Sequence, residues 1–457
     1  MKSLRGSWVG LGSLCLAACA SGPNYQRPEM QTPPVYRELG DWKPGQPADD
    51  VIPASWWPAF GDPTLNQLEA QVDVSNQTLK AAAAAYAQSR ALLASARSAY
   101  WPTLSVDGGR TRSARGTNPP QNINDAAADA GWAPDVWGRV RRSVESAHAS
   151  AAASAADLAA VRLSLQATLA SDYFELRIQD GLIALLDATV SADQQAVQIT
   201  RNRYDAGVAA RADLVTAQTQ LLGIQAQQLN AGILRAQLEH AIAVLVGATP
   251  ESFTIAKTTL PELVPGVPVG VPSTLLQRRP DVAAAERQVA ASNAQIGVAR
   301  SAWFPTLSLS GSDSYSNTVV SSLLKLPNRI WSVGPALAET LFDGGARDAK
   351  VQQARAAYDQ DVAVYRQSVL GALEQVEDDL ANLRTLQQQA AVEDALVKSA
   401  HEAETLTLNQ YKAGTVPYSS VITSQTTALN SEQTALGVLR NRLTGSVALI
   451  AALGGGW

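Results

Sequence analysis

The clearest pattern in the chain is an alternation of period two between residues 306 and 316. Every even position from 308 to 316 is Ser, whereas the odd positions carry Leu307, Leu309 and Tyr315, with Asp313 as an exception. This pattern predicts a β-strand with one polar and one mainly apolar face. Its expected partner is 330–342, with a polar loop between them over about 317–329. An earlier, weaker pair is predicted at 103–112 and 130–137, joined by a loop over about 113–129.

Long Ala-rich stretches flank both strand pairs. Residues 63–99 and 281–301 predict helices that end just before a Pro. After each pair, Gly138 or Gly344-Gly345 opens a helix expected to reach about 203 or 410. At a rise of 1.5 Å per residue, some 65 residues give a helix of about 100 Å. The stretches 211–246 and 418–453 predict return helices, so two long antiparallel hairpins are expected.

The chain contains an internal duplication. The hexapeptide Arg203–Val208 recurs as Gln410–Thr415, an offset of 207 residues, and several later positions recur at the same offset. The pentapeptide Trp101–Ser105 resembles Phe304–Ser308 at an offset of 203. We therefore expect five segments: an export signal at 1–18, an extended segment at 19–62, a first repeat at 63–250, a linker at 251–272 and a second repeat at 273–457.

The first residues read as an export signal. Lys2 and Arg5 precede an apolar stretch that runs from Trp8 to Ala18. The sequence Leu16–Cys19 resembles the bacterial lipobox, which implies that Cys19 becomes the lipidated first residue of the mature protein. Cys15 is lost with the signal, so no internal disulfide can form. Residue 20 is Ala and not the Asp that often retains lipoproteins in the inner membrane, which favours the outer membrane.

Composition and charge exclude several functions. Hydrophobic residues make up 46% of the chain but aromatic residues only 6%, which suits thin helix-on-helix packing of small side chains. The net charge of −5, without a basic patch, disfavours a nucleic-acid partner. The three histidines are scattered, and Glu145-x-x-His148 occurs only once although a di-iron bundle needs this motif twice. No catalytic motif is present, so we expect no enzyme activity, no metal and no cofactor.

Beyond the signal, the chain contains no run of about 20 apolar residues, so a membrane could be crossed only by strands. Four strands are too few for a barrel, since bacterial single-chain barrels need at least eight. If the strands enter a membrane, several chains must pool them. Three chains would supply twelve strands, and their six hairpins would form a helical tube. The alternative is a soluble sheet that caps a periplasmic coiled coil.

An ordered set of motifs resembles the TolC/OprM outer-membrane efflux proteins, in particular their NodT-like lipoprotein branch. The similarity covers nearly all of the mature chain. The motifs that carry it are Gly22–Pro28, Trp56-Trp57, Phe60–Pro63, Asp135–Arg142, Arg279–Val282, Ala285-Glu286, Ile296–Ala299, Phe304–Leu309, Leu341–Gly345 and Ala452–Trp457.

The resemblance implies a mainly helical fold with a small β part. Three copies would form a 12-stranded barrel in the outer membrane above a periplasmic α-barrel. The homotrimer would be a passive conduit for drugs and other small toxic compounds. The hairpin tips would form a gate and would dock on a periplasmic adaptor linked to an inner-membrane pump. The residues assigned to the tips are Tyr204, Asp205, Gly207, Asp213, Tyr411, Lys412, Gly414 and Val416.

Two positions depart from the family pattern. Val416 stands where the family often has Asp after the second tip, so an acidic ring cannot be assigned there. Ala133-Pro134 stands where Glu and an aliphatic residue are usual, and Pro in a central strand removes a ladder hydrogen bond. Two other functions stay open: a duct for type I protein secretion, and a periplasmic coiled-coil lipoprotein scaffold that does not span the membrane.

Overall fold

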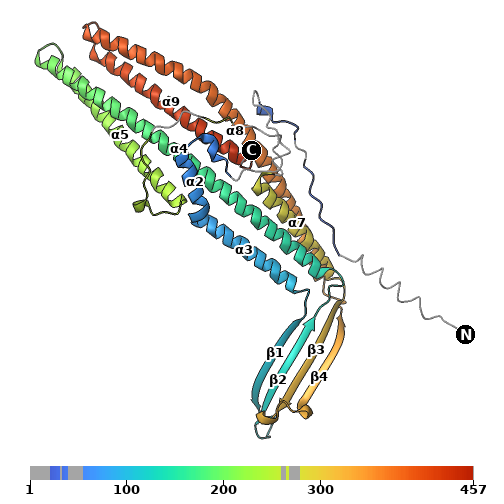
Figure 1. The fold of residues 1–457 in the computed structure, drawn as a ribbon. Helices are drawn as coiled ribbons and strands as arrows, with labels where there is room; N and C mark the ends of the chain where they lie inside the picture. The colour runs from blue at the N-terminus through green and yellow to red at the C-terminus, as the bar shows by residue number, and fades with distance from the viewer. Residues whose placement is uncertain (1–20, 31–32, 40–54, 259–263, 267–277, 456–457) are drawn as a thin grey trace. The chain divides into compact units, whose positions relative to one another are not determined.

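The computed structural model describes residues 21–30, 33–39, 55–258, 264–266 and 278–455. The expected signal at 1–18 and the lipidation site at Cys19 lie outside these residues. The helices and strands, in chain order, are α2 (Pro63–Ser75), α3 (Gln77–Ser98), β1 (Thr103–Ser113), β2 (Gln121–Trp132), α4 (Arg139–Asp205), α5 (Arg211–Leu245), α7 (Pro280–Ser301), β3 (Thr306–Asn317), β4 (Arg329–Ala338), α8 (Ala346–Lys412) and α9 (Tyr418–Ala452) (Figure 1).

The element order confirms the duplication. Each half contains a helical stretch, a strand pair, a long helix and a return helix. The two long helices, α4 and α8, contain 67 residues each, and the two return helices, α5 and α9, contain 35 each. None of the described helices carries an apolar run long enough to cross a lipid bilayer.

One predicted helix is two helices in the structure. The stretch expected to be helical over 63–99 breaks at Asn76, which separates α2 from α3. The Asn76 side chain accepts a hydrogen bond from the backbone N–H of Leu79, 2.9 Å away, and so caps the start of α3. Its amide also donates to the carbonyl of Leu245, at 2.7 Å, and thus ties the break to the end of α5.

The chain divides into two compact units. The first contains Met1–Met30, Ala84–Ala156 and Ala284–Gln367, and the second contains Gln31–Ala83, Asp157–Ala283 and Ser368–Trp457. The first unit holds one antiparallel sheet with the strand order β1-β2-β3-β4. Strands β1 and β4 are therefore its edges, and neither has a second strand partner within the described chain.

The sequence placed β2 wrongly. It was expected at 130–137, but it spans Gln121–Trp132 and ends before Ala133-Pro134, so Pro134 breaks no ladder. The loop before it is accordingly shorter than expected. The middle of this strand, 125–130, consists only of Asp and Ala, which both have low β propensity, so the pattern did not resemble a strand. Pairing with β1 on one side and β3 on the other decides the conformation. Strand β4 also ends earlier than expected, at Ala338.

In the first unit, the segment at 21–30 is fixed against the helices by Arg142. This side chain is 4% exposed, and its guanidinium donates to the carbonyl of Ser21 and to the side chain of Asn24, at 3.1 and 2.9 Å. Gly297 allows the segment to cross α7, since a Cβ there would lie 2.8 Å from the Ser21 carbonyl oxygen. The segment at 21–30 is therefore a fixed part of this unit.

The second unit contains the main hydrophobic core. Aromatic residues before α2 pack onto α4, with the rings of Phe60 and Phe174 4.8 Å apart. Asp62 caps α2 by accepting from the backbone N–H groups of Thr64 and Leu65. It also accepts a 2.5 Å hydrogen bond from the hydroxyl of Tyr173. The motif Phe60–Pro63 therefore has a structural role.

Candidate functional site

Both hairpins turn at a glycine. Gly207 lies between α4 and α5 with φ = 73°, and Gly414 lies between α8 and α9 with φ = 80°. The N–H of the residue after each glycine bonds back to a carbonyl of the long helix, at Arg203 and Gln410 respectively. Only glycine adopts such a φ without strain, which explains why the Ala-Gly pair occurs at both tips.

The structure places all eight predicted tip residues at or next to these turns, in different environments. Asp205, Gly207, Lys412 and Gly414 are exposed, and Asp213 and Val416 are half-buried. The two tyrosines of the repeated motif differ most. Tyr204 is 39% exposed, whereas Tyr411 is 6% exposed. The duplication therefore does not make the two tips equivalent.

Tyr411 is buried because two residues of the second unit cover it. The guanidinium carbon of Arg203, at the end of α4, lies 4.5 Å from the centre of the Tyr411 ring. The same guanidinium donates to the carbonyl oxygen of Tyr411 at 3.4 Å. Tyr418, at the start of α9, packs its ring 5.2 Å from that of Tyr411. This cluster connects the ends of α4, α8 and α9.

Sequence reasoning did not find Arg203 or Tyr418. A signal was available in the repeat, because the offset of 207 pairs Arg203 with Gln410 and Tyr418 with Arg211. These differences mark the positions where the two tips have separate roles. The residues that both repeats share predicted the position of each turn but not the side chains that pack around it.

Titratable side chains lie along the helices behind this cluster, some of them buried. Asp193 on α4 is 3% exposed, and one of its carboxylate oxygens has no hydrogen-bond partner. Burial, together with the charge of Glu404 on α8, raises the pKa of Asp193 to about 6. His401 lies 2.8 Å from a carboxylate oxygen of Glu432 on α9, and this hydrogen bond together with Glu404 raises the pKa of the imidazole. The protonated forms of both side chains are therefore favoured in this packing.

The two faces of the sheet differ in chemistry. Residues directly opposite one another on neighbouring strands share a face. One face carries large exposed apolar side chains, among them Leu104, Val106, Trp331, Val333 and Leu337, which are 64–78% exposed. The other face carries the Ser residues of β3 together with Asp residues of β1 and β2. The predicted two-faced strand pattern thus extends across all four strands.

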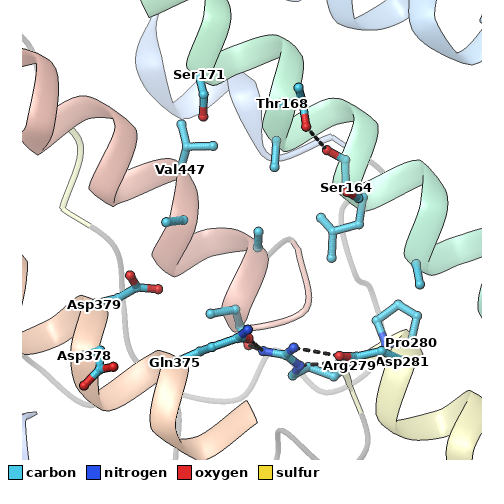
Figure 2. A pocket seen from close by; sticks show the side chains of 16 residues that line it. Ser164, Thr168, Ser171, Arg279, Pro280, Asp281, Gln375, Asp378, Asp379 and Val447 are labelled. Carbon is cyan, nitrogen blue, oxygen red and sulfur yellow. Dashed lines mark hydrogen bonds and ion pairs between the residues drawn. The ribbon is translucent and has the colours of Figure 1, made fainter. Parts of the chain in front are cut away.

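The motif Arg279–Val282 lies beside an open cavity of about 780 Å³ in the second unit (Figure 2). Arg279 donates to the carbonyl of Ala452 at the end of α9 and to the side chain of Gln375 on α8, at 3.0 and 2.8 Å. Its other nitrogens pair with Asp281, at 2.7 and 3.1 Å. Arg279 is 9% exposed, so this motif holds helix ends together.

The chain is similar to outer membrane efflux proteins over nearly its whole length. The family model for outer membrane efflux proteins matches the chain twice, over residues 69–248 and 271–455. The probable efflux pump outer membrane protein TtgC of Pseudomonas putida is 28% identical over 459 residues, covering 98% of this chain and 95% of that protein. Nodulation protein T of Rhizobium leguminosarum bv. trifolii is 31% identical, covering 88% of this chain and 87% of that protein.

A solved structure shares the fold as well. The outer-membrane channel OprN is 30% identical and superposes with a TM-score of 0.87, covering 96% of this chain and 100% of that chain. The matches extend through both strand pairs and both hairpins.

Proposed function

Since this chain belongs to the outer membrane efflux protein family, we propose that three copies of it close one passive channel through the outer membrane. The chain is the outer-membrane channel component of an efflux pump. We further propose the number of copies, the partners that bind the tips and the class of compound that is exported. We expect drugs or other small toxic compounds as cargo, because relatives are described as antibiotic and toluene efflux pump proteins.

The main support for assembly of several copies is a row of exposed apolar residues on α5. Val215, Leu222 and Leu229 recur every seven residues and are 50, 64 and 72% exposed. At the offset of 207 they correspond to Ile422, Leu429 and Leu436 on α9, which are half-buried or buried. Leu429, for example, is 5% exposed in a cluster with α4 and α5 side chains. The second repeat thus packs its row onto the first repeat, whereas the row on α5 has no counterpart in the described chain.

A second copy can supply that counterpart. Leu185 on α4 packs against the cluster that receives Leu429. Its equivalent on α8, Val392, is 67% exposed. The row on α5 of one copy would cover the surface around Val392 of the next copy, in the way that α9 covers α4 within one chain. Such a head-to-tail contact generates a ring, and six hairpins from three copies would complete it.

The sheet requires the same assembly. Its edges β1 and β4 expose backbone N–H and C=O groups that lipid cannot satisfy. If β4 of one copy pairs with β1 of the next, three copies give twelve strands and leave no edge. The apolar face would then contact lipid, and the Ser-rich face would line the channel.

At the other end of the channel, the hairpin tips would meet the pump. The exposed residues Asp205, Gly207, Lys412 and Gly414 would form the surface that docks on a periplasmic adaptor, which connects the channel to an inner-membrane pump. The cluster of Arg203, Tyr411 and Tyr418 would help to hold the tip closed. The energy for export would come from the pump, since a channel wall performs no chemistry.

Substitution of Leu222 by Glu tests the assembly. We expect L222E to remain monomeric in light scattering of the detergent-purified protein, because a charge would replace the centre of the apolar row. We also expect no conductance steps in planar bilayers. The matched control is Thr219→Glu, which adds the same charge at an exposed position of α5 outside the row. Trimers of L222E with normal conductance would overturn the proposal.

A further inference from the structure

Arginines gather at one end of the apolar face of the sheet, where the strands are farthest from the helices. Arg110 lies opposite Asn124, and Arg112 lies opposite Asn122, in the last ranks of the β1–β2 ladder. Since Leu104 and Val106 precede them at even positions of the same strand, these arginines share the apolar face. On this face, β1 therefore begins with apolar side chains and ends with two cationic ones.

The charges of the sheet are sorted by face. Within the four strands, the apolar face contains one carboxylate, Asp313, and it is bound bidentately by Arg329 at 2.8 and 2.9 Å. In the described chain no hydrogen bond or ion pair engages the guanidinium of Arg110 or of Arg112. The charged residues of the opposite face are all acidic: Asp107, Asp125 and Asp129.

The spacing along the strands matches the thickness of a membrane. Arg110, Asn124 and Asn317 lie in one rank, and Asn317 is ten residues beyond Leu307, which begins the apolar face on β3. At about 3.4 Å per residue, these ten residues span about 34 Å along the strand. With a strand tilt of about 40°, this equals about 26 Å across the bilayer, close to the apolar band of about 25 Å in barrels of the outer membrane.

The other end of this band carries aromatic residues, as expected at a membrane boundary. Trp101 and Phe304 stand just before β1 and β3 and are 74 and 42% exposed. Aromatic side chains favour the level of lipid headgroups. If they mark the periplasmic boundary, then the rank of Arg110 marks the outer one.

We infer that Arg110 and Arg112 bind the phosphate groups of a phosphorylated lipid in the outer leaflet. This inference rests on the proposed function, because it needs the apolar face to contact lipid. Guanidinium groups bind phosphate bidentately, and two of them on one face, about 7 Å apart along the strand, can engage one headgroup. A soluble anion passing through the channel would meet the other face, which carries only carboxylates.

The experiment measures binding of diphosphorylated lipid A to the purified trimer by native mass spectrometry. The test variant is the double substitution R110Q/R112Q. At roughly fivefold in affinity for each cation near an anionic surface, we expect it to bind at least about tenfold more weakly than the wild type. Dephosphorylated lipid A should bind the wild type as weakly as diphosphorylated lipid A binds the variant. R110K/R112K keeps the charge but loses the bidentate geometry, so its affinity should lie between those of R110Q/R112Q and the wild type.

The matched control is R90Q/R97Q, which removes two exposed arginines from α3 of the same unit. We expect it to bind lipid A like the wild type. Equal binding of diphosphorylated lipid A by R110Q/R112Q and the wild type would overturn the inference, and so would equal binding of dephosphorylated lipid A. Because R110Q/R112Q should still form trimers with normal conductance, failure of the channel itself would be seen separately, as absence of trimers or conductance in the wild type.

Discussion

The guanidinium of Arg203 lies over the ring of Tyr411, 4.5 Å from its centre, and thereby joins the end of the first long helix to the end of the second. The two residues are far apart in the sequence and belong to different repeats. Tyr204, which holds the place of Tyr411 in the first repeat, remains 39% exposed. One tip is therefore held by packing that the other lacks.

We expect Arg203→Ala to raise the spontaneous opening of the channel about two- to fivefold in planar bilayers. The substitution removes a cation–π contact worth about 0.5–1 kcal/mol at an exposed site. Arg201→Ala serves as the control, because it removes an equally charged, exposed side chain two residues closer to the middle of α4. If both variants open as often as the wild type, Arg203 does not hold the tip.

The duplicated tyrosines should respond differently to truncation. Tyr411→Ala removes a buried ring and should destabilise the second tip by about 3 kcal/mol, whereas Tyr204→Ala should change its own tip by less than about 1 kcal/mol. Hydrogen exchange of the backbone amides in the two turns measures both effects. Equal increases in exchange at the two tips would contradict the asymmetry seen in the structure.

The tip should become more firmly packed as the pH falls. Burial and Glu404 raise the pKa of Asp193 to about 6, above the ordinary value near 4. The packed tip therefore favours the protonated carboxyl, and its stability is greatest below about pH 4 and declines as the pH rises through 6. His401 acts with the same sign, since the hydrogen bond to Glu432 raises the pKa of the imidazole.

Channel opening measured at pH 7.5 and 5.5 checks this expectation. The wild type should open less often at pH 5.5. Asp193→Asn should open less often than the wild type at pH 7.5 and should show a weaker pH dependence, and His401→Gln separates the contribution of the imidazole. More frequent opening of the wild-type channel at pH 5.5 than at pH 7.5 would contradict this expectation.

Replacing Glu69 by Leu should stabilise the protein. The Glu69 side chain is fully buried on α2, and neither carboxylate oxygen has a hydrogen-bond partner. Burial raises the pKa of Glu69 to about 9, so the wild type should lose stability as the pH rises from about 4 through 9. We expect E69L to gain about 2 kcal/mol at pH 7.5.

Urea unfolding at pH 7.5 and 9.5 measures this gain. The wild type should have a lower free energy of unfolding at pH 9.5 than at pH 7.5, and the free energy of unfolding of E69L should depend less on pH. Glu374→Leu, which replaces an exposed carboxylate on α8, should give no comparable gain. A lower urea midpoint for E69L than for the wild type would show that the carboxyl has a polar partner in the assembled protein.

Arg279→Met should destabilise the second unit by about 2 kcal/mol, because it leaves the buried carbonyl of Ala452 without its donor and removes the hydrogen bond to Gln375 on α8. The adjacent substitution Arg278→Met is the matched control. Thermal unfolding followed by circular dichroism distinguishes the two. A midpoint for R279M as high as that of R278M would assign the motif a role other than holding helix ends.

The sequence predicted the hairpins well because helical pattern, turn glycines and internal repetition all pointed to the same boundaries. It failed at β2, whose middle consists only of Ala and Asp, because only pairing with neighbouring strands imposes the extended conformation there. It also failed to anticipate the break at Asn76, since a capping side chain in the middle of a helical stretch looks like any other polar residue.

The predicted tip residues are placed at the turns, but their roles in docking and gating stay predictions. A repeated motif indicates a common backbone conformation, as Gly207 and Gly414 show. It does not indicate what surrounds each copy, because the neighbours of Tyr411 come from other helices. Arg203 and Tyr418 could be recognised only where the repeats differ.

The equal lengths of the two repeats have an evolutionary consequence. Helices α4 and α8 have the same number of residues, as do α5 and α9. In a ring built from both kinds of hairpin, adding seven residues to each of the two helices of only one hairpin would make three tips about 10 Å longer than the other three. A single partner surface could then no longer meet all six. If the tips dock on one partner, changes in length would be tolerated only when both halves of the gene acquire them together, so that two sequences that are free to diverge in composition would keep one common length.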